Sequence, residues 1–506
     1  MWENIYNAVS SANDWLNGIV WGWPMIILIL GTGILLTFRT RLMQIRKLGE
    51  SIGTTIVPTI KSLGARKEAD KTANSISQFE AFATAISGTV GTGNIIGVTS
   101  AILTGGPGAV FWMWISAFFG MITNYAENVL GLYFRKKDSN GNFSGGAFYY
   151  ISEGMGKGWT WLGYLAAAFC MLAAIGMSGV QTNKISGTIS SGFSGLEPGT
   201  VKLIVGIVVA VIAALVIIGG IKRIGRVAAV LVPFMSLLFI AMSVIIILTH
   251  FKSIGTAFGA IFSNAFNFKA AGGGIFGYSF GTVIKKGMAR GVFSNEAGLG
   301  SSVIAHSASE TREPVRQGLW GIFEVFFDTF VICTLTAVSL LSNYDLNALG
   351  LEGLTDDSFV AMNVFTSNFG VLGTVCFCVI LPLFAFTTIL AWSYYGEKGT
   401  EFLFRGLGKK GQSAAVMVFK VVFVLLIVVS AVINGELAWA ISDTANGLMA
   451  IPNLVAVICL SGLVVKITKN YYDRRSGKKV KPMLSHYDTQ NESFIRDISS
   501  GDPRYM

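Results

Sequence analysis

Charged residues are scarce in this chain. Of its 506 residues only 13% are Asp, Glu, Lys or Arg, whereas 52% are hydrophobic and the mean hydropathy is +0.60. A soluble protein needs about 25% charged residues to cover its surface, so the composition excludes one. Histidine and cysteine are also rare, with three and five residues, and they form no CxxC or HExxH motif. Neither a metalloenzyme site nor a disulfide framework is therefore expected.

A nucleotide-binding loop is missing as well. The string GTGNIIG places glycines at 91, 93 and 97, so the last spacing is one residue too long for GxGxxG, and Ile96 stands where that motif needs glycine. No Lys-Ser or Lys-Thr pair follows directly, as a P-loop would require. A protein driven by ATP is therefore not supported.

Long apolar stretches take up most of the chain. A window of about 19 residues finds about eleven of them that could cross a bilayer as helices. They cover residues 19–38, 79–102, 108–134, 158–183, 200–221, 226–249, 271–304, 317–341, 369–396, 413–434 and 437–465. The sequence predicts an all-α, polytopic membrane protein, in which the 60 glycines allow close helix packing and breaks beside a cavity.

Basic residues mark one side of the membrane. They cluster after the first, third, fifth, seventh and ninth spans and in the tail, while the loop after the eighth span is acidic. The positive-inside rule then predicts an outer N-terminus and a cytoplasmic C-terminus in the plasma membrane of a prokaryote. This topology explains the net charge of +10, so nucleic acid is not an expected partner.

The apolar spans and the basic loops divide the chain into six segments. Residues 1–38 form an outer segment and an extra membrane helix, which lacks the features of a cleavable signal and is expected to stay as an anchor. Two blocks of five spans cover 79–249 and 271–466, joined by an outer loop at 250–270. The other two segments are a basic connector along the cytoplasmic membrane surface at 39–78 and a solvated, basic cytoplasmic tail at 467–506.

The second and seventh spans are rich in glycine and small polar residues. The second carries Gly88, Gly91, Gly93 and Gly97 among serines and threonines, and the seventh carries seven glycines between 272 and 291. Both are poor continuous helices, and irregular backbone at membrane depth is tolerated only where it is buried in protein or lines a cavity. A GxxxG packing face is the alternative for Gly93 and Gly97, but it does not explain the polar residues beside them.

These two spans open the two blocks, and the seventh comes five spans after the second, so the second block is inverted. Paired broken helices in inverted halves are typical of a secondary transporter with a site near the membrane midplane. Half-helix N-termini there would bind an anionic group, and unwound carbonyls a cation. An amino-acid carboxylate and a sodium ion suit such a site.

Six strings of the sequence resemble the alanine/glycine:cation symporter family of bacteria and archaea. They are GTGNIIGVTSAI (91–102), GGPGAVFWMW (105–114), NYAENVLGLYFR (124–135), GGAFYYISEGMG (145–156), RGVFSNEAGLGSSVIAHSA (290–308) and PVRQGLWGIFEVFFDT (314–329). The resemblance runs to about residue 466. It implies the inverted five-helix repeats of the amino acid, polyamine and organocation superfamily, the LeuT-like fold. It also implies Na⁺ or H⁺ coupling and small neutral amino acids as substrates.

The resemblance places a substrate site on the two broken spans. The amides of Gly91, Thr92 and Gly93 should hold the carboxylate, and residues 276–281 should form the opposite wall, with Phe280 as a lid. A break near 287–291 is the alternative. The expected substrate-binding residues are Thr89, Gly91, Thr92, Gly93, Asn94, Phe276, Gly277, Ser279, Phe280, Gly281, Thr388 and Trp392.

The ninth span supplies the expected sodium ligands. The resemblance gives this role to the hydroxyls of Thr387 and Thr388, with backbone near Gly88 to Gly91. The alternative is that both hydroxyls bond to their own helix. Trp392 follows one turn after Thr388, and with Phe280 it should leave little room for a substrate side chain.

Ionisable residues within membrane spans are costly to bury, so each is a candidate functional residue. They are Glu127, Glu324, Asp328 and Asp443, which either form a proton path or, as favoured here, pair with Lys285, Lys286 or Arg290. Asn295 and Glu296 are expected near the cytoplasmic end of the seventh span, as a latch of the inner gate. His250 and His306 are expected to be packed at membrane edges rather than to carry protons.

The sequence therefore favours a symporter that moves alanine, glycine, D-alanine or glutamine inward with sodium by alternating access. No cofactor is expected besides Na⁺ as the coupling ion, and a monomer suffices. A proton-coupled symporter is the alternative. A membrane enzyme is disfavoured because no nucleophile, base or metal cluster converges, and a channel because two broken spans imply an occluded site.

Overall fold

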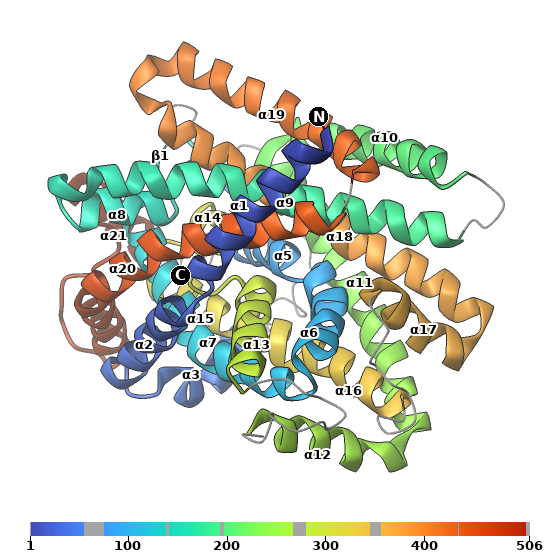
Figure 1. Ribbon diagram of the computed structural model, residues 1–506. Coiled ribbons are helices and arrows are strands. Elements are labelled where there is room, and N and C mark those ends of the chain that lie inside the picture. The colour runs from blue at the N-terminus through green and yellow to red at the C-terminus, as the bar shows by residue number, and fades with distance from the viewer. Residues whose placement is uncertain are drawn as a thin grey trace.

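The computed structural model describes residues 2–54, 75–137, 141–192, 197–266, 280–344, 356–433 and 435–501. Nearly all of these residues are helical, and the helices form one bundle (Figure 1). The strands in these ranges are the two-residue pair β1 (Lys136–Lys137) and β2 (Phe143–Ser144), which is antiparallel. The all-α prediction is confirmed.

Two long helices open the chain. They are α1 (Trp2–Val20) and α2 (Trp23–Arg39), and α2 packs against α7 (Gly108–Phe134) and α20 (Gly435–Arg475). Where α2 crosses α7, a Cβ added to Gly33 would lie 2.4 Å from Phe119 Cβ. The connector predicted at 39–78 contains α3 (Met43–Arg46), and its residues 55–74 lie outside the described ranges.

The first block opens with an interrupted helix. Ser77 caps α5 (Gln78–Thr89), since its hydroxyl accepts from the Glu80 amide at 3.1 Å and the Glu80 carboxylate accepts from the Ser77 amide at 2.9 Å. The chain then bends by 46° and continues as the π-helix η1 (Gly93–Gly97) and as α6 (Val98–Gly105). The block continues with α7, α8 (Ala147–Gly154), η2 (Lys157–Trp159), α9 (Thr160–Gly192), α10 (Pro198–Ile217) and α11 (Gly220–Thr249).

The second block also opens with an interrupted helix. After η3 (Phe251–Ser253) and α12 (Ile254–Ala265), helix α13 (Phe280–Asn295) ends at an irregular segment, residues 296–301, which α14 (Ser302–Ser307) follows. The remaining elements are α15 (Pro314–Val325), η4 (Phe326–Cys333), α16 (Thr334–Asn343), α17 (Asp357–Phe369), α18 (Val371–Leu403), η5 (Arg405–Leu407), α19 (Gly408–Val432), α20 and α21 (Asp488–Ser499).

Nine helices in the described ranges are long and apolar enough to cross a membrane, and the bent pair of α5 with α6 makes ten. The prediction is about eleven. The further predicted span, 271–304, begins with residues outside the described ranges and continues as the separate helices α13 and α14.

The interrupted helices lie at the centre of the bundle. Helix α6 runs beside α13, and α5 contacts α14 and α18 (Figure 1). Helix α18 packs closely along α9. A Cβ added to Gly399 of α18 would lie only 2.9 Å from the Ala167 carbonyl oxygen of α9, so this approach requires glycine.

The chain beyond the last span is folded onto the bundle. Phe143, Leu484 and Phe494 form a buried apolar cluster that joins α21 to the loop after α7, with Ile495 and Ile498 packed against it. The expectation of a solvated tail at 467–506 is wrong for these residues. The apolar face of α21 is buried against the bundle.

Candidate functional site

The first interruption lies at residues 90–92, between α5 and η1. The Gly91 amide donates to Asn94 Oδ1 at 2.9 Å, and the Thr92 amide donates to Gln181 Oε1 of α9 at 3.2 Å. Two of the three amides expected to hold a carboxylate are thus occupied by side-chain oxygens. The Thr92 hydroxyl is buried without a hydrogen-bond partner among the described residues, so it is free to bond to a ligand.

The second interruption lies at residues 296–301, between α13 and α14. Three residues there have positive φ: Glu296 at 54°, Gly298 at 93° and Gly300 at 73°. Glycine adopts this conformation without steric cost, so the two glycines allow the irregular backbone between α13 and α14. Of the wall predicted before this point, Phe276, Gly277 and Ser279 lie outside the described residues.

The alternative break at Gly287 to Gly291 is wrong, because α13 is continuous there. These glycines instead let α13 approach α7. A Cβ on Gly287 would lie 2.4 Å from the Ala109 carbonyl oxygen, and a Cβ on Gly291 would lie 2.9 Å from Ser116 Cβ.

Phe280 and Gly281 lie in the first turn of α13, away from the second interruption. The Phe280 ring is 6.1 Å from the Trp112 ring, and a Cβ on Gly281 would be 3.4 Å from the Trp23 ring. The predicted lid position of Phe280 is therefore not found.

Phe293 is the aromatic residue of α13 that approaches η1. A Cβ on Gly93 would lie 3.2 Å from the Phe293 ring, whereas a Cβ on Gly97 would meet nothing within 4 Å. The close-packing alternative is therefore wrong for Gly97. On its other side Phe293 stacks on Trp439 of α20, with ring centroids 5.2 Å apart and planes at 16°.

Helix α18 brings one of its two threonines to the first interruption. The Thr388 hydroxyl donates to the Ser87 carbonyl oxygen at 2.9 Å and to the Phe384 carbonyl oxygen at 3.0 Å. The Thr387 hydroxyl donates to the Phe384 carbonyl oxygen at 3.0 Å and contacts the Met235 sulfur at 3.6 Å. Thr388 therefore links α5 to α18, while Thr387 faces α11.

Glu296 joins the two interruptions. Its carboxyl accepts from the Ser301 hydroxyl at 2.5 Å and lies beside the Trp392 side chain. A Cβ on Gly88 would lie 3.2 Å from Glu296 Oε1 and 2.9 Å from the Tyr395 hydroxyl, which is buried without a partner among the described residues. The predicted residues Gly88, Glu296 and Trp392 thus meet, together with Tyr395.

Asn295 and Glu296 lie at the second interruption, where α13 ends. Both are fully buried. Asn295 donates to the Thr329 hydroxyl at 3.1 Å and accepts from the Ala297 amide at 3.1 Å. These bonds hold Asn295 where α13 ends, and the role of the two residues as a latch of the inner gate stays a prediction.

A buried carboxyl gathers polar groups from both broken helices. Asp328 of η4 accepts from the Asn94 side-chain amide at 2.6 Å, from the Ser294 hydroxyl at 2.9 Å and from the Thr329 hydroxyl at 2.9 Å. Asn94 comes from the first broken helix and Ser294 from the second. Asp328 therefore belongs to the site, which the prediction of a lysine or arginine partner missed.

The other ionisable residues are paired in different ways. Arg290 pairs with Asp443 at 3.1 Å, as one of the predicted ion pairs. Glu324 instead contacts His306 at 2.7 Å, and Glu127 bonds to Asn453, so the predicted basic partners are wrong for these two carboxyls. His306 is fully buried and packed, and His250 lies at the end of α11 with Nδ1 3.1 Å from the Ile246 carbonyl oxygen.

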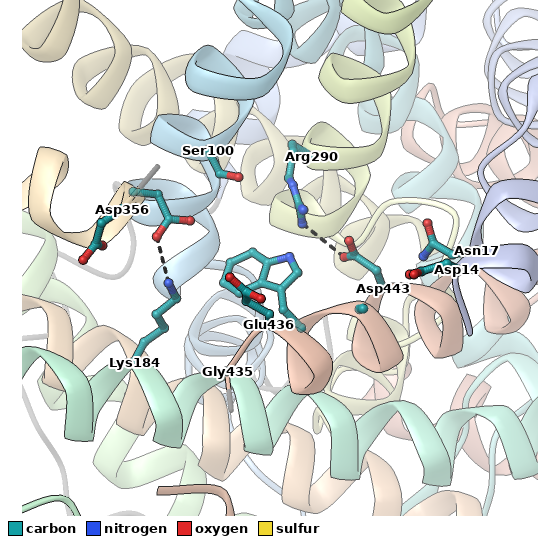
Figure 2. Close-up of a pocket in the computed structure, with 12 residues that line it drawn as sticks. Asp14, Asn17, Ser100, Lys184, Arg290, Asp356, Gly435, Glu436 and Asp443 are labelled. Atoms are coloured by element: carbon teal, nitrogen blue, oxygen red, sulfur yellow. Dashed lines mark hydrogen bonds and ion pairs between the residues drawn. The ribbon is translucent and has the colours of Figure 1, made fainter. Parts of the chain in front are cut away.

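A cavity of about 550 Å³ is lined by Trp439, whose ring stacks on Phe293. Figure 2 shows Arg290 paired with Asp443 at one side of the cavity. On the other side Lys184 pairs with Asp357 at 2.8 Å. The guanidinium of Arg290 and the ammonium of Lys184 lie 4.9 and 5.5 Å from the Trp439 ring centroid. Trp439 therefore forms the floor of the cavity between two ion pairs.

Sequence reasoning missed Gln181 and Tyr395, since each lies on a span whose hydropathy is ordinary. It missed Phe293 because it placed the wall of the seventh span at residues 276–281, well before the observed interruption at 296–301. The SNEAGLGS string of residues 294–301 held the clearest unused signal for the second interruption, because it places two glycines beside a glutamate at membrane depth.

Comparisons with known proteins agree with this architecture. A family model described as the sodium:alanine symporter family matches residues 6–485. The sodium/alanine symporter AgcS of Methanococcus maripaludis is 43% identical over 472 residues, which cover 92% of this chain and 97% of that protein. The amino-acid carrier protein AlsT of Bacillus subtilis is 32% identical and covers 94% of each chain.

The fold matches that of a solved structure. MhsT, in its crystal structure with L-phenylalanine, superposes with a TM-score of 0.52 at 15% identity, over 78% of this chain and 98% of that one. The inverted-repeat, LeuT-like fold is thereby confirmed. From the family match and the identity to AgcS over nearly the whole of both chains, this chain belongs to the sodium:alanine symporter family.

Proposed function

We propose that this protein carries a small neutral amino acid inward across a prokaryotic plasma membrane, coupled to sodium, by alternating access. The observation that carries the proposal is the meeting of two interrupted helices in one buried polar site, at residues 90–92 and 296–301. Such interruptions provide backbone groups for a zwitterion and a cation at membrane depth. The name of the relative AgcS, a sodium/alanine symporter, supports alanine as the first candidate substrate.

The substrate carboxylate would bind the amides of Gly91, Thr92 and Gly93. Two of these amides now donate to the side-chain oxygens of Asn94 and Gln181. A carboxylate accepts a stronger hydrogen bond than an amide oxygen does, so the exchange favours the substrate. The released oxygens of Asn94 and Gln181 can then accept from the substrate ammonium group.

Sodium would bind where α5 ends beside α18. The Thr388 hydroxyl and the Ser87 carbonyl are oxygen ligands, 2.9 Å apart, and hard cations take oxygen ligands. The carboxylate of Asp328, with Asn94, offers a second group of oxygens nearby. We assign Thr387 a supporting role, since its hydroxyl faces its own helix and Met235.

The cavity lined by Arg290 and Asp443 would be the outer access route. Phe293 and Trp439 separate it from Gly93, so opening the route requires these two rings to move. The basic loops lie at the opposite ends of the spans, which supports an outer N-terminus and a cytoplasmic tail.

The test is uptake of labelled alanine by proteoliposomes under an inward sodium gradient. We expect saturable accumulation above equilibration, competition by glycine and D-alanine, and loss of uptake when choline replaces sodium at clamped pH. Equal uptake in choline would assign coupling to protons or to passive flux. A chemical product would identify an enzyme, and a current that does not saturate would identify a channel.

Thr388→Ala tests the cation site, with Thr387→Ala as its matched control on the same helix. Losing one ligand costs on the order of 1.5 kcal/mol, so Thr388→Ala should raise the half-saturating sodium concentration about tenfold. Thr387→Ala should leave that concentration nearly unchanged. The opposite ranking would move the sodium site to the α11 face of α18.

A further inference from the structure

The chain after the last span is fastened to the loops at one end of the bundle. The His486 amide donates to the Tyr133 carbonyl oxygen at 2.9 Å, and the Gln490 side chain donates to the Arg135 carbonyl oxygen at 3.2 Å. The Phe494 ring of α21 packs on Phe143 with centroids 5.8 Å apart. These contacts attach α21 to the end of α7.

Arg135 connects α21 to the chain that follows α14. Its fully buried guanidinium donates to the carbonyl oxygens of Ser307 at 3.0 Å and Ser309 at 2.6 Å, and also to that of Thr311. The same guanidinium lies 3.9 Å from the centroid of the Phe143 ring, on which Phe494 packs. The segment 307–311 is thus held on the same support as α21.

A second contact reaches this segment directly from α21. Arg312 pairs with Asp497 at 2.7 Å, and its guanidinium lies 4.9 Å from the Phe494 ring centroid. The side chains of Arg312 and Asp497 are 11% and 30% exposed, so the ion pair is partly shielded from water. Just before the segment that leads to α21, Arg474 pairs with Glu313 at 2.6 Å.

The same segment holds the start of the first broken helix. The Ile76 amide donates to the Ala308 carbonyl oxygen at 3.3 Å, and the Glu310 amide donates to the Ile76 carbonyl oxygen at 2.8 Å. Helix α5 begins two residues later, and Ala81 of α5 is buried against Ile76 and Ala308. A chain of direct contacts therefore runs from α21 through 307–312 to α5.

We propose that residues 476–499 form a strap that keeps the path from the site to the cytoplasm closed, and that release of the strap favours the inward-open conformation. The inference rests on the proposed alternating-access cycle, in which the cytoplasmic halves α5 and α14 must separate from their neighbours. A bound element shifts such an equilibrium by its difference in affinity for the two conformations. The strap should bind the closed conformation more tightly than the inward-open one, because its contacts hold together segments that opening would separate.

The test measures how often α5 opens, using a cysteine at Ala81. Purified full-length Ala81→Cys protein in sodium is labelled with a bulky water-soluble maleimide, and the parent protein with its five native cysteines gives the background. The rate is compared with and without Arg312→Glu, Asp497→Arg, the double charge swap, and a stop after residue 476. Because labelling needs no substrate, its outcome is independent of whether the protein transports alanine.

Each single charge reversal should raise the labelling rate about fivefold, since a partly buried pair is worth on the order of 1 kcal/mol. The swap should restore the original rate, and the truncation should raise the rate at least as much as the single changes. Lys478→Glu is the matched control, because Lys478 pairs with Asp473 within the same tail at 2.6 Å and should leave the rate unchanged. An unchanged rate in the single reversals, or no restoration in the swap, would overturn the proposal even if the truncated chain does not fold.

Discussion

Gly91→Ala tests the geometry of the site with one added methyl group. A Cβ at Gly91 would lie 2.5 Å from Thr388 Oγ1 and 3.4 Å from Gln181 Oε1. The first distance is far below van der Waals contact, so the Thr388 hydroxyl must move away from the Ser87 carbonyl oxygen. The substitution thus disturbs the proposed sodium ligands and the carboxylate-binding amides together.

The expected magnitude follows from overpacking. Forcing an extra methyl group into a close-packed interior costs about 1–3 kcal/mol. If this cost falls on the sodium-bound state, the half-saturating sodium concentration rises about 5- to 140-fold, at 1.4 kcal/mol per factor of ten. Gly97→Ala is the matched control, because its Cβ would meet nothing within 4 Å and its φ of −63° is helical.

The assay is sodium-dependent alanine uptake at matched amounts of reconstituted protein. Thr388→Ala in the Gly91→Ala background should reduce the added cost of the methyl group, since the clashing hydroxyl is gone. A half-saturating sodium concentration within twofold of wild type in Gly91→Ala would refute the placement of Thr388 beside the first interruption. So would an equal effect of Gly97→Ala.

Three further predictions use the same assay. Phe293→Leu should let leucine and methionine compete better against labelled alanine, because Phe293 approaches Gly93. Phe280→Leu should not change this competition, because Phe280 packs on Trp112. The reverse result would restore Phe280 as the lid. Trp392→Leu should also admit bulkier amino acids, since the buried ring fills space beside Glu296, and an unchanged competition profile would show that Trp392 does not bound the pocket. An inside-negative potential of about 100 mV should by itself support roughly 40-fold accumulation for one sodium, because it is worth about 2.3 kcal/mol per charge; accumulation unaffected by voltage would indicate an electroneutral cycle.

Local sequence was enough for the membrane spans and the first interruption. Hydropathy is a property of each stretch of about 19 residues, so the spans can be found without knowing their neighbours. The capping box of Ser77 and Glu80 also marks the start of α5 within a few residues. The polar residues around Gly91 then indicate an interruption, because polar backbone at membrane depth requires a protein environment.

Only the tertiary structure decided where the second interruption lies. Gly287 and Gly291 would be equally suited to a break or to close packing, and the nearness of α7 determines that they serve packing. Phe293, Gln181 and Tyr395 likewise enter the site through helices that cross far from them in sequence. The charge of the tail predicts a solvated segment, but the apolar side of α21 is buried because the loop after α7 offers it a surface. Whether a glycine breaks a helix or an apolar residue docks depends on the neighbour it meets, which a single stretch of sequence does not contain.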